Sequence, residues 1–171
     1  MDDVVHDAAQ TADGDDAGHS GLDRLNECAR TALDLARREA IAAGEDALCT
    51  EHLLVGLAET TRGAAKRVLD ELNLDAEHLR ATVRFIVGPG ANTEPANGRM
   101  EYSPRTRRVL ALAARDADKR GAAQIGTLNL LSGLLRERAG VAVLLLETPG
   151  VGLELAGQAL SRAHREGWKD D

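Results

Sequence analysis

The sequence predicts an all-α fold of eight helices, arranged as two pseudo-twofold-related units of four. The first observation is an internal repeat, because residues 25–79 align with residues 102–156 at a constant offset of 77 without a gap. The second is composition: aromatic residues make up 2% of the chain and apolar residues 43%, so Leu, Ala, Val and Ile must form the core, a mixture that favours helices. The third is helical spacing of apolar residues in both copies. Identical pairs include Arg30/Arg107, Leu33/Leu110, Leu35/Leu112, Gly44/Gly121, Thr50/Thr127, Leu53/Leu130, Leu54/Leu131, Gly56/Gly133, Leu57/Leu134, Gly63/Gly140 and Leu69/Leu146.

A repeat of this length indicates one structural unit of about 55 residues that is used twice. A unit this small buries too little surface to be stable alone. We therefore expect the two copies to dock face to face around a shared core.

The first helix of each copy has a clear apolar stripe and a glycine stop. Apolar or small residues stand at 25, 28, 29, 32, 33, 36 and 40 in the first copy and at 102, 106, 109, 110, 113 and 117 in the second. Gly44 and Gly121 end these helices. Ser103-Pro104 marks the second start, since serine caps a helix and proline is favoured at its first position.

Three further helices follow in each copy. Thr50 and Thr127 are the expected N-caps of the second helices. The third helices begin after Gly63 and Gly140; Asn73 and Pro149-Gly150 are their expected ends. The fourth helices cover residues 75–87 and about 152–163. No segment carries a strand signal, so no sheet is expected.

Composition divides the chain into five segments. The stretch between the copies contains two prolines, three glycines and two asparagines, and the first residues are rich in Asp, Ala and Gly. The predicted segments are a disordered acidic tail (1–24), the first repeat (25–87), a linker (88–101), the second repeat (102–165) and a polar tail (166–171).

Charge argues against a nucleic-acid partner. The net charge of −7 comes mainly from residues 1–24, which hold seven aspartates and one basic residue, Arg24. The rest of the chain has 20 basic and 21 acidic residues and offers no excess positive charge for phosphates.

Neither a signal peptide nor an apolar run of membrane-spanning length is visible. Two cysteines without a close-spaced motif fit a reducing compartment, so a cytoplasmic protein without membrane contact is expected.

Motifs for catalysis are missing. The sequence lacks G-x-x-x-x-G-K-[ST], G-x-S-x-G and H-E-x-x-H, so ATP hydrolysis and other enzymatic activity are not expected, nor is a cofactor. The five histidines are scattered, so no metal site is expected. One enzymatic alternative stays open: if the helix starts that carry Cys28 and Cys49 lie together, the thiols could serve a small thiol-dependent enzyme or redox sensor. The alternative is that both are simply small buried residues.

Thr50-Glu51-His52-Leu53-Leu54 is the most informative short motif. In structural terms Thr50 caps the helix, Glu51 complements the helix dipole and the leucines pack. A functional interpretation uses the same physics. Free N–H groups at a helix start attract an anion, and a neighbouring carboxylate holds a cation, so the motif suits a ligand that carries both charges.

The repeat unit resembles the Clp N-terminal repeat, which occurs in tandem at the front of ClpC- and ClpA-type unfoldases. The resemblance covers about 140 of 171 residues and rests on Arg30, Leu33, Leu35, Ala36, Gly44, Thr50-Glu51-His52-Leu53-Leu54, Gly56-Leu57, Gly63, Ala65 and Val68-Leu69. It implies a compact all-α domain that binds substrates, adaptors or degradation signals. The chain lacks the family's ATPase modules, so we expect a stand-alone binding module, an adaptor or decoy whose partners are Clp components or their clients.

The resemblance also implies a ligand. In ClpC-type N-domains each repeat can hold a phosphoarginine side chain, between helix-start groups and the Glu of T-E-H. Matched residue by residue, the first copy offers Asn26, Thr50 and Glu51, with Asn26 in place of Thr or Ser. The second copy offers Ser103 and Thr127, but has Leu128-Asn129 in place of Glu-His. We therefore expect at most one phosphoarginine-like ligand per chain, with a degenerate second site.

Overall fold

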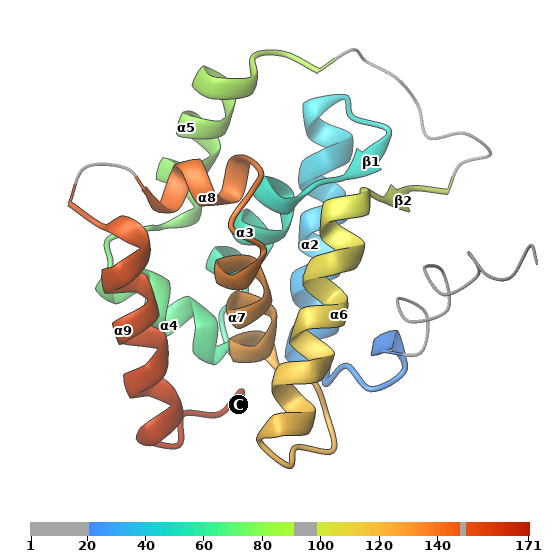
Figure 1. Cartoon of the computed structure of the whole chain (residues 1–171). Helices are drawn as coiled ribbons and strands as arrows, with labels where there is room; N and C mark the ends of the chain where they lie inside the picture. The colour runs from blue at the N-terminus through green and yellow to red at the C-terminus, as the bar shows by residue number, and fades with distance from the viewer. Residues whose placement is uncertain (1–20, 91–98, 148–149) are drawn as a thin grey trace, which may run out of the picture.

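The computed structural model describes residues 21–90, 99–147 and 150–171 (Figure 1). The predicted disorder of residues 1–20, and the linker residues 91–98, lie outside the described residues. The described part contains eight helices and two short strands: α2 (Glu27–Ala43), β1 (Ala47–Leu48), α3 (Thr50–Glu59), α4 (Ala64–Glu71), α5 (Ala76–Val87), β2 (Glu101–Tyr102), α6 (Pro104–Lys119), α7 (Thr127–Glu137), α8 (Val141–Leu146) and α9 (Gly152–Arg165).

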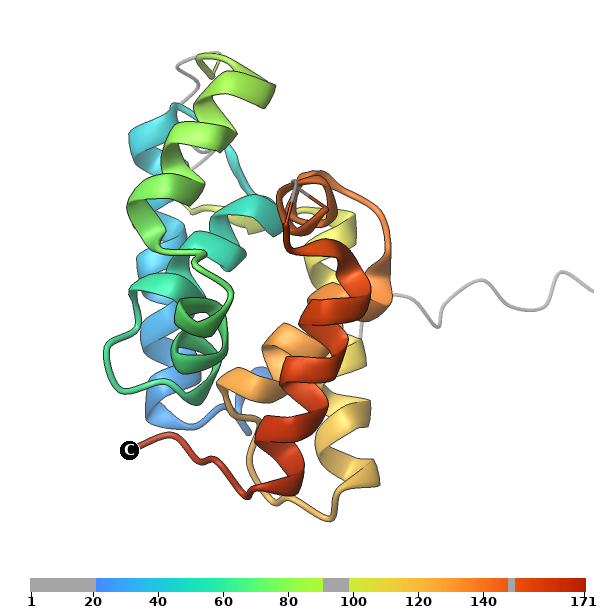
Figure 2. The ribbon, with the colours of Figure 1, turned by 90° about the vertical axis from the view of Figure 1, so that its left-hand side faces the viewer.

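The two repeats form the two sides of the molecule. Figure 2 shows α2–α5 on one side and α6–α9 on the other. Within each repeat the first two helices make the most extensive contact, α2 with α3 and α6 with α7. Helices α3 and α7 lie at the centre, where each also contacts helices of the other repeat. The predicted fold of eight helices in two units of four is confirmed.

The central helices pack unusually closely on the first helix of each repeat. A Cβ atom added to Gly56 of α3 would lie 2.3 Å from the carbonyl oxygen of Ala32 in α2. One added to Gly133 of α7 would lie 2.5 Å from the carbonyl oxygen of Val109 in α6. The identity of these two positions in the sequence repeat therefore reflects a backbone approach that only glycine permits.

Most predicted helix boundaries hold, but the caps of the second helices do not. Asn26 and Ser103 cap α2 and α6 through their side chains, and Gly44 ends α2 in the left-handed conformation. In contrast, Thr50 and Thr127 are the first residues of α3 and α7, after the cap residues Cys49 and Gly126. The Thr127 hydroxyl accepts a hydrogen bond from the Ala65 amide of the other repeat, 3.0 Å away, instead of capping its own helix.

The expectation of no sheet is wrong at one small place. Strand β1 pairs in parallel with β2, with Leu48 opposite Tyr102, and Leu25 and Ile125 form an equivalent isolated bridge. Both pairings join one repeat to the other. They hold the start of α6 beside the start of α3, and the start of α2 beside the start of α7.

The folded body extends beyond the predicted boundaries at both ends. Arg24 donates to the carbonyl oxygen of Ala123 and pairs with Asp118 at 2.8 Å, so residues 21–24 contact the second repeat. The predicted polar tail also packs: the Asp171 amide donates to the carbonyl oxygen of Arg62, and Arg67 stacks over the Trp168 ring. No helix within the described residues is long and apolar enough to cross a membrane.

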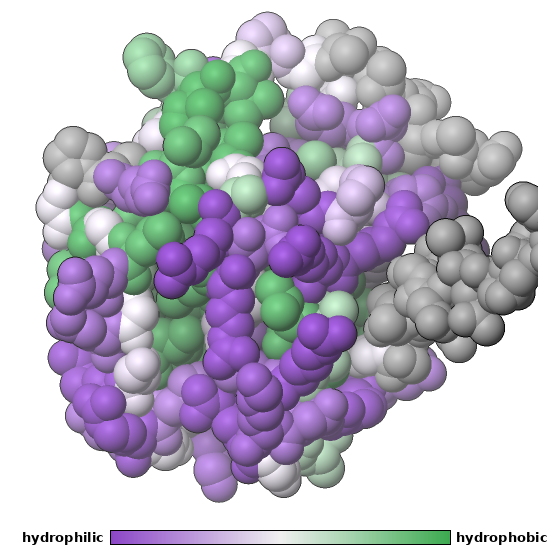
Figure 3. All heavy atoms as spheres, in the orientation of Figure 1, coloured by the Kyte–Doolittle hydropathy of each residue, from purple (hydrophilic) through white to green (hydrophobic). Residues whose placement is uncertain are grey.

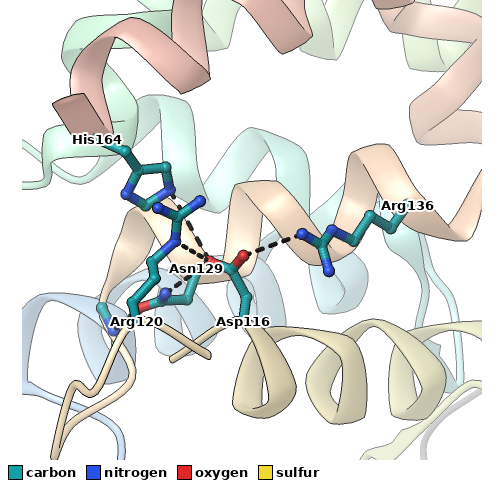
Figure 4. Close-up of polar contacts among 6 residues, drawn as sticks. Asp116, Arg120, Asn129, Arg136 and His164 are labelled. Carbon is teal, nitrogen blue, oxygen red and sulfur yellow. Dashed lines mark hydrogen bonds and ion pairs between the residues drawn. The ribbon is translucent and has the colours of Figure 1, made fainter. Parts of the chain in front are cut away.

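A buried carboxylate joins α6 to α7 and lies beside α9 in the second repeat (Figure 4). Asp116 of α6 is almost inaccessible to solvent and accepts hydrogen bonds from Asn129 of α7 at 2.9 Å, Arg120 at 3.0 Å and Arg136 at 3.3 Å. His164 of α9 lies 3.9 Å away. Burial raises the pKa of Asp116, but hydrogen bonds from Arg120 and Asn129 more than offset this and leave the pKa lowered.

Candidate functional site

Helix starts gather at two places, one on each side of the interface between the repeats. The α3–α6 site contains the starts of α3 and α6, with Gly140 before α8. The α2–α7 site contains the starts of α2, α4 and α7. Each site takes its residues from both repeats, because β1–β2 and the Leu25–Ile125 bridge cross between them.

The α3–α6 site is built around Cys49, Thr50 and Ser103. The Ser103 amide donates to the carbonyl oxygen of Leu48 at 3.0 Å, and the Cys49 thiol hydrogen-bonds with the Ser103 side chain. The Thr50 hydroxyl faces Gly140, where an added Cβ would come within 2.8 Å of it. The first amides of α3, which carry partial positive charge, thus lie beside two hydroxyl groups, whereas α6 begins with Pro104, which has no amide hydrogen.

Glu51 supplies a buried carboxylate at this site. Its side chain accepts a hydrogen bond from the Thr50 hydroxyl at 3.3 Å and borders a pocket of about 420 Å³ between α2, α3 and α5. Desolvation by burial is the largest cause that raises the pKa of Glu51, and hydrogen bonds with its backbone and Thr50 only partly offset it. No lysine or arginine among the described residues forms an ion pair with Glu51. Burial of an ionised carboxylate is energetically unfavourable, and a carboxylate in such a place is typical of a binding site.

Cys49, Glu51 and His52 are the one group in the described chain with metal-ligand spacing, but the group does not fit a metal ion. Their potential ligand atoms lie within 4.8 Å of one another. However, His52 Nδ1 accepts a hydrogen bond from the Cys49 amide at 3.0 Å, which leaves the proton on Nε2. Burial lowers the pKa of His52 to about 4 and raises the pKa of the Cys49 thiol. A metal would have to break the helix cap and deprotonate a thiol that its surroundings keep protonated.

The α2–α7 site holds a carboxylate of the same chain. Asp170 accepts hydrogen bonds from the Asn26 side chain, the Thr127 amide and the Ala64 amide, each at 2.8 Å, and from the Thr127 hydroxyl at 2.5 Å. Figure 2 shows how its segment runs from the end of α9 to the side of α2 and α4. Sequence reasoning missed Asp170, because its neighbours are polar and gave no sign that the segment folds back.

The structure groups the predicted site residues differently from the sequence. Asn26 was grouped with Thr50 and Glu51, but it lies beside Thr127. Ser103 was grouped with Thr127, but it lies beside Cys49 at the start of α3. The residues that match the family motif and lie together are therefore Ser103, Thr50 and Glu51. Leu128, which replaces the second glutamate, follows Thr127 in the α2–α7 site and is buried.

The two cysteines belong to different sites and both are free. The Cys28 thiol lies within hydrogen-bond distance of two backbone oxygens in the α2–α7 site, that of Asp171 at 3.4 Å and that of Arg62 at 3.7 Å. Burial raises the pKa of both thiols, and the Asp170 carboxylate raises that of Cys28 further. These surroundings oppose formation of a reactive thiolate.

Alkylation should therefore be slow at neutral pH for both cysteines. Because both pKa values lie above the usual 9.0, the labelling rate should rise with pH and keep rising past pH 9. Mass spectrometry of iodoacetamide-treated protein between pH 6 and 10 would measure each site. Rapid labelling that is already complete at pH 6 would contradict this expectation and favour a thiol-based activity.

An apolar face lies over the end of α5. Figure 3 shows hydrophobic side chains gathered there. Phe85 is 90% exposed, and Ile86, Val87 and Ile41 are also exposed. Val83 and Val87 line the pocket that Glu51 borders. Adjacent apolar side chains of this size on a protein surface are typical of a surface that contacts another molecule.

Sequence comparison finds one matching family model, the Clp repeat (R) N-terminal domain, over residues 24–166. The chain is 36% identical over 135 residues to the negative regulator of genetic competence ClpC/MecB of Bacillus subtilis, which covers 79% of this chain and 16% of that protein. It is 34% identical over 152 residues to the chaperone protein ClpB of Oceanobacillus iheyensis, covering 84% of this chain and 18% of that protein. The chain thus spans less than a fifth of these relatives.

Comparison with solved structures finds the same fold. The N-terminal domain of ClpD from Arabidopsis thaliana matches with a TM-score of 0.70 and 23% identity, covering 84% of this chain and 99% of that domain. A ClpV N-domain in complex with a VipB peptide matches with a TM-score of 0.60 and 16% identity, covering 84% of this chain and 91% of that domain.

Proposed function

The chain belongs to the Clp repeat N-terminal domain family, and from this we propose that it is a non-enzymatic protein-binding module of the Clp protease system. A related fold, the ClpV N-domain, has been solved with a bound peptide, which supports a peptide-binding role. The module would work in the cytoplasm as an adaptor that delivers clients or as a decoy that withholds them. Its nearly neutral body argues against nucleic acid. The raised pKa values of Cys28 and Cys49 argue against the thiol-based alternative.

We further propose that the α3–α6 site binds a phosphoarginine-like group on a client protein. The single observation that carries this proposal is Glu51, a buried carboxylate in the first turn of α3 that accepts from the Thr50 hydroxyl, at the site where the Ser103 side chain lies against Cys49. Helix-start amides suit the phosphoryl group, and a carboxylate suits the guanidinium group. The α2–α7 site has Leu128 at the matching position and holds Asp170. We therefore expect one ligand per chain.

Glu51→Gln should weaken phosphoarginine binding by about tenfold to a hundredfold, because a charge-assisted hydrogen bond contributes about 1.5–3 kcal/mol. The same change should leave the unfolding temperature unchanged or raise it. The pKa of Glu51 is higher in the folded protein than in the unfolded chain, so stability falls as pH rises from 4.5 through the folded value, and glutamine removes that loss. Calorimetric titration with a phosphoarginine peptide, combined with thermal unfolding, measures both.

Two control variants sharpen this experiment. Glu77→Gln makes the same change at an exposed first-turn glutamate of α5 and should leave affinity unchanged. Asn26→Ala should also leave affinity unchanged, because Asn26 lies in the other site. A stoichiometry of two equivalent ligands, or a loss with Asn26→Ala equal to that with Glu51→Gln, would contradict the proposed site. An unchanged affinity in Glu51→Gln would contradict the role of the carboxylate.

A further inference from the structure

The Asp170 carboxylate fills a pocket whose donors are all directed at one anion. One oxygen accepts from the Asn26 side chain and the Thr127 amide, and the other accepts from the Ala64 amide and the Thr127 hydroxyl. These donors come from the starts of α2, α7 and α4. Each start carries partial positive charge, so three helices and both repeats contribute to a single anion position.

Gly126 leaves space for the Asp170 carboxylate. An added Cβ would lie 2.8 Å from one Asp170 oxygen and 3.2 Å from the Asn26 side-chain nitrogen. The φ angle of Gly126 is −99°, which other residues adopt readily. Glycine is therefore needed here for the approach of the anion and not for the backbone conformation.

We infer that the α2–α7 site is an anion-binding pocket that the chain closes with its own residues 167–171, and that a phosphoryl or carboxylate group of another molecule enters only when Asp170 leaves. Leu128 offers no carboxylate for a cation, so the pocket takes a simple anion and not a ligand that carries both charges. The site thus differs in ligand class from the α3–α6 site. The inference does not depend on phosphoarginine binding there.

The segment that carries Asp170 can leave without unfolding the body. Outside the pocket it is held by the partly buried Trp168, which stacks with Arg67 at 4.1 Å, and by the contacts of Asp171 with the carbonyl oxygen of Arg62 and the Cys28 thiol. Lys169 and Asp171 are exposed. A short surface segment with few buried contacts belongs to the part of a structure that opens most easily.

Phosphate titration of the full chain tests this inference, with backbone amide chemical shifts of Ala64 and Thr127 as the readout. Asp170→Ala should bind inorganic phosphate at these amides, with an apparent dissociation constant at least about tenfold lower than that of the unchanged protein, in which the pocket is already occupied. Acetate should change the chemical shifts of the same two amides if the pocket also accepts a carboxylate. Potassium chloride at matched ionic strength corrects for screening. Asp171→Asn removes the same charge at the exposed neighbour and should behave like the unchanged protein.

A peptide with the sequence of residues 167–171 should compete with phosphate for the Asp170→Ala protein, whereas the same peptide with Asp170→Asn should not. If Asp170→Ala does not fold, full-length Asp170→Asn replaces it, because asparagine keeps the shape, loses the charge and puts a donating NH2 group in place of one accepting oxygen. Chemical-shift changes on phosphate addition that are equally large in the variant and in the unchanged protein would overturn the inference. So would the absence of any shift at Ala64 and Thr127 in the variant.

Labelling of Cys28 gives a second readout of tail departure. Its thiol contacts the backbone oxygen of Asp171 and is buried with the segment in place. Asp170→Ala should speed alkylation of Cys28 and leave that of Cys49 unchanged, as resolved by mass spectrometry. Equal rates at Cys28 in both proteins would show that Asp170 does not hold the segment, and would contradict the inference.

Discussion

Gly56→Ala is expected to destabilise the protein by about 3 kcal/mol or more. The new Cβ would lie 2.3 Å from the carbonyl oxygen of Ala32 and 2.9 Å from the amide nitrogen of Ala36. Both atoms belong to the backbone of α2, so no side-chain rotation relieves the contact. The helices must separate, and overpacking that moves the backbone costs at least the upper part of the usual 1–3 kcal/mol.

Thermal unfolding measures this loss, which corresponds to a fall of about 6–12 °C in a domain of this size. Gly133→Ala should behave similarly, because its Cβ would lie 2.5 Å from the Val109 carbonyl oxygen. Gly157→Ala in α9 is the matched control: no atom lies within 4 Å of the added Cβ, so alanine should stabilise the helix by up to about 1 kcal/mol. Equal midpoints for Gly56→Ala and Gly157→Ala would show that α2 and α3 are not in close contact.

Asp116→Ala should destabilise the protein by about 2–3 kcal/mol. The change removes the acceptor shared by Asn129, Arg120 and Arg136, and leaves the buried amide of Asn129 without that partner. Breaking a fully buried ion pair costs about 3–5 kcal/mol, but both arginines here are partly exposed and regain water, which reduces the loss. Urea unfolding at pH 7 measures it.

The loss of stability caused by Asp116→Ala should depend on pH in one direction. The folded pKa of Asp116 is lower than its ordinary value of 3.8, so its contribution is complete well above pH 3.8 and is lost as pH falls through the folded value. The difference between the original protein and Asp116→Ala should therefore narrow below about pH 4. Asp34→Ala, which removes an exposed pair with Arg37, should change stability by less than about 0.5 kcal/mol. A difference that widens on acidification would contradict the assignment.

The helices could be predicted from sequence because each depends on local chemistry. Apolar spacing located the stripes, and Ser103, Asn26 and Gly44 act on their own helices as capping rules require. The capping rules gave the wrong role for Thr50 and Thr127, because tertiary contacts determine what their hydroxyl groups bind. Their hydroxyl groups serve the partner helix and a neighbouring carboxylate, so the cap moves back by one residue. The two-residue strands are too short to leave a sequence pattern.

The candidate site could be predicted only in part. The residue types were found, since each follows from the motif, but their grouping depends on how the repeats dock. A constant offset shows that Asn26 corresponds to Ser103 and says nothing about which copy of the second helix each one meets. Asp170 lay beyond prediction for a related reason: its donors come from residues 26, 64 and 127, which are distant in sequence.

The crossing of β1 onto β2 and of Leu25 onto Ile125 has a consequence for how the two copies can diverge after duplication. Each of the two sites takes its residues from both copies, so its ligand preference should depend on residues of both copies. Substitutions in different copies at one site, such as at Ser103 and Glu51, should show strong epistasis in double-mutant cycles. The effects of substitutions at Asn26 and Glu51 should be additive, although both residues lie in the same copy. Leu128 in the α2–α7 site is therefore compatible with an intact carboxylate at Glu51 in the α3–α6 site.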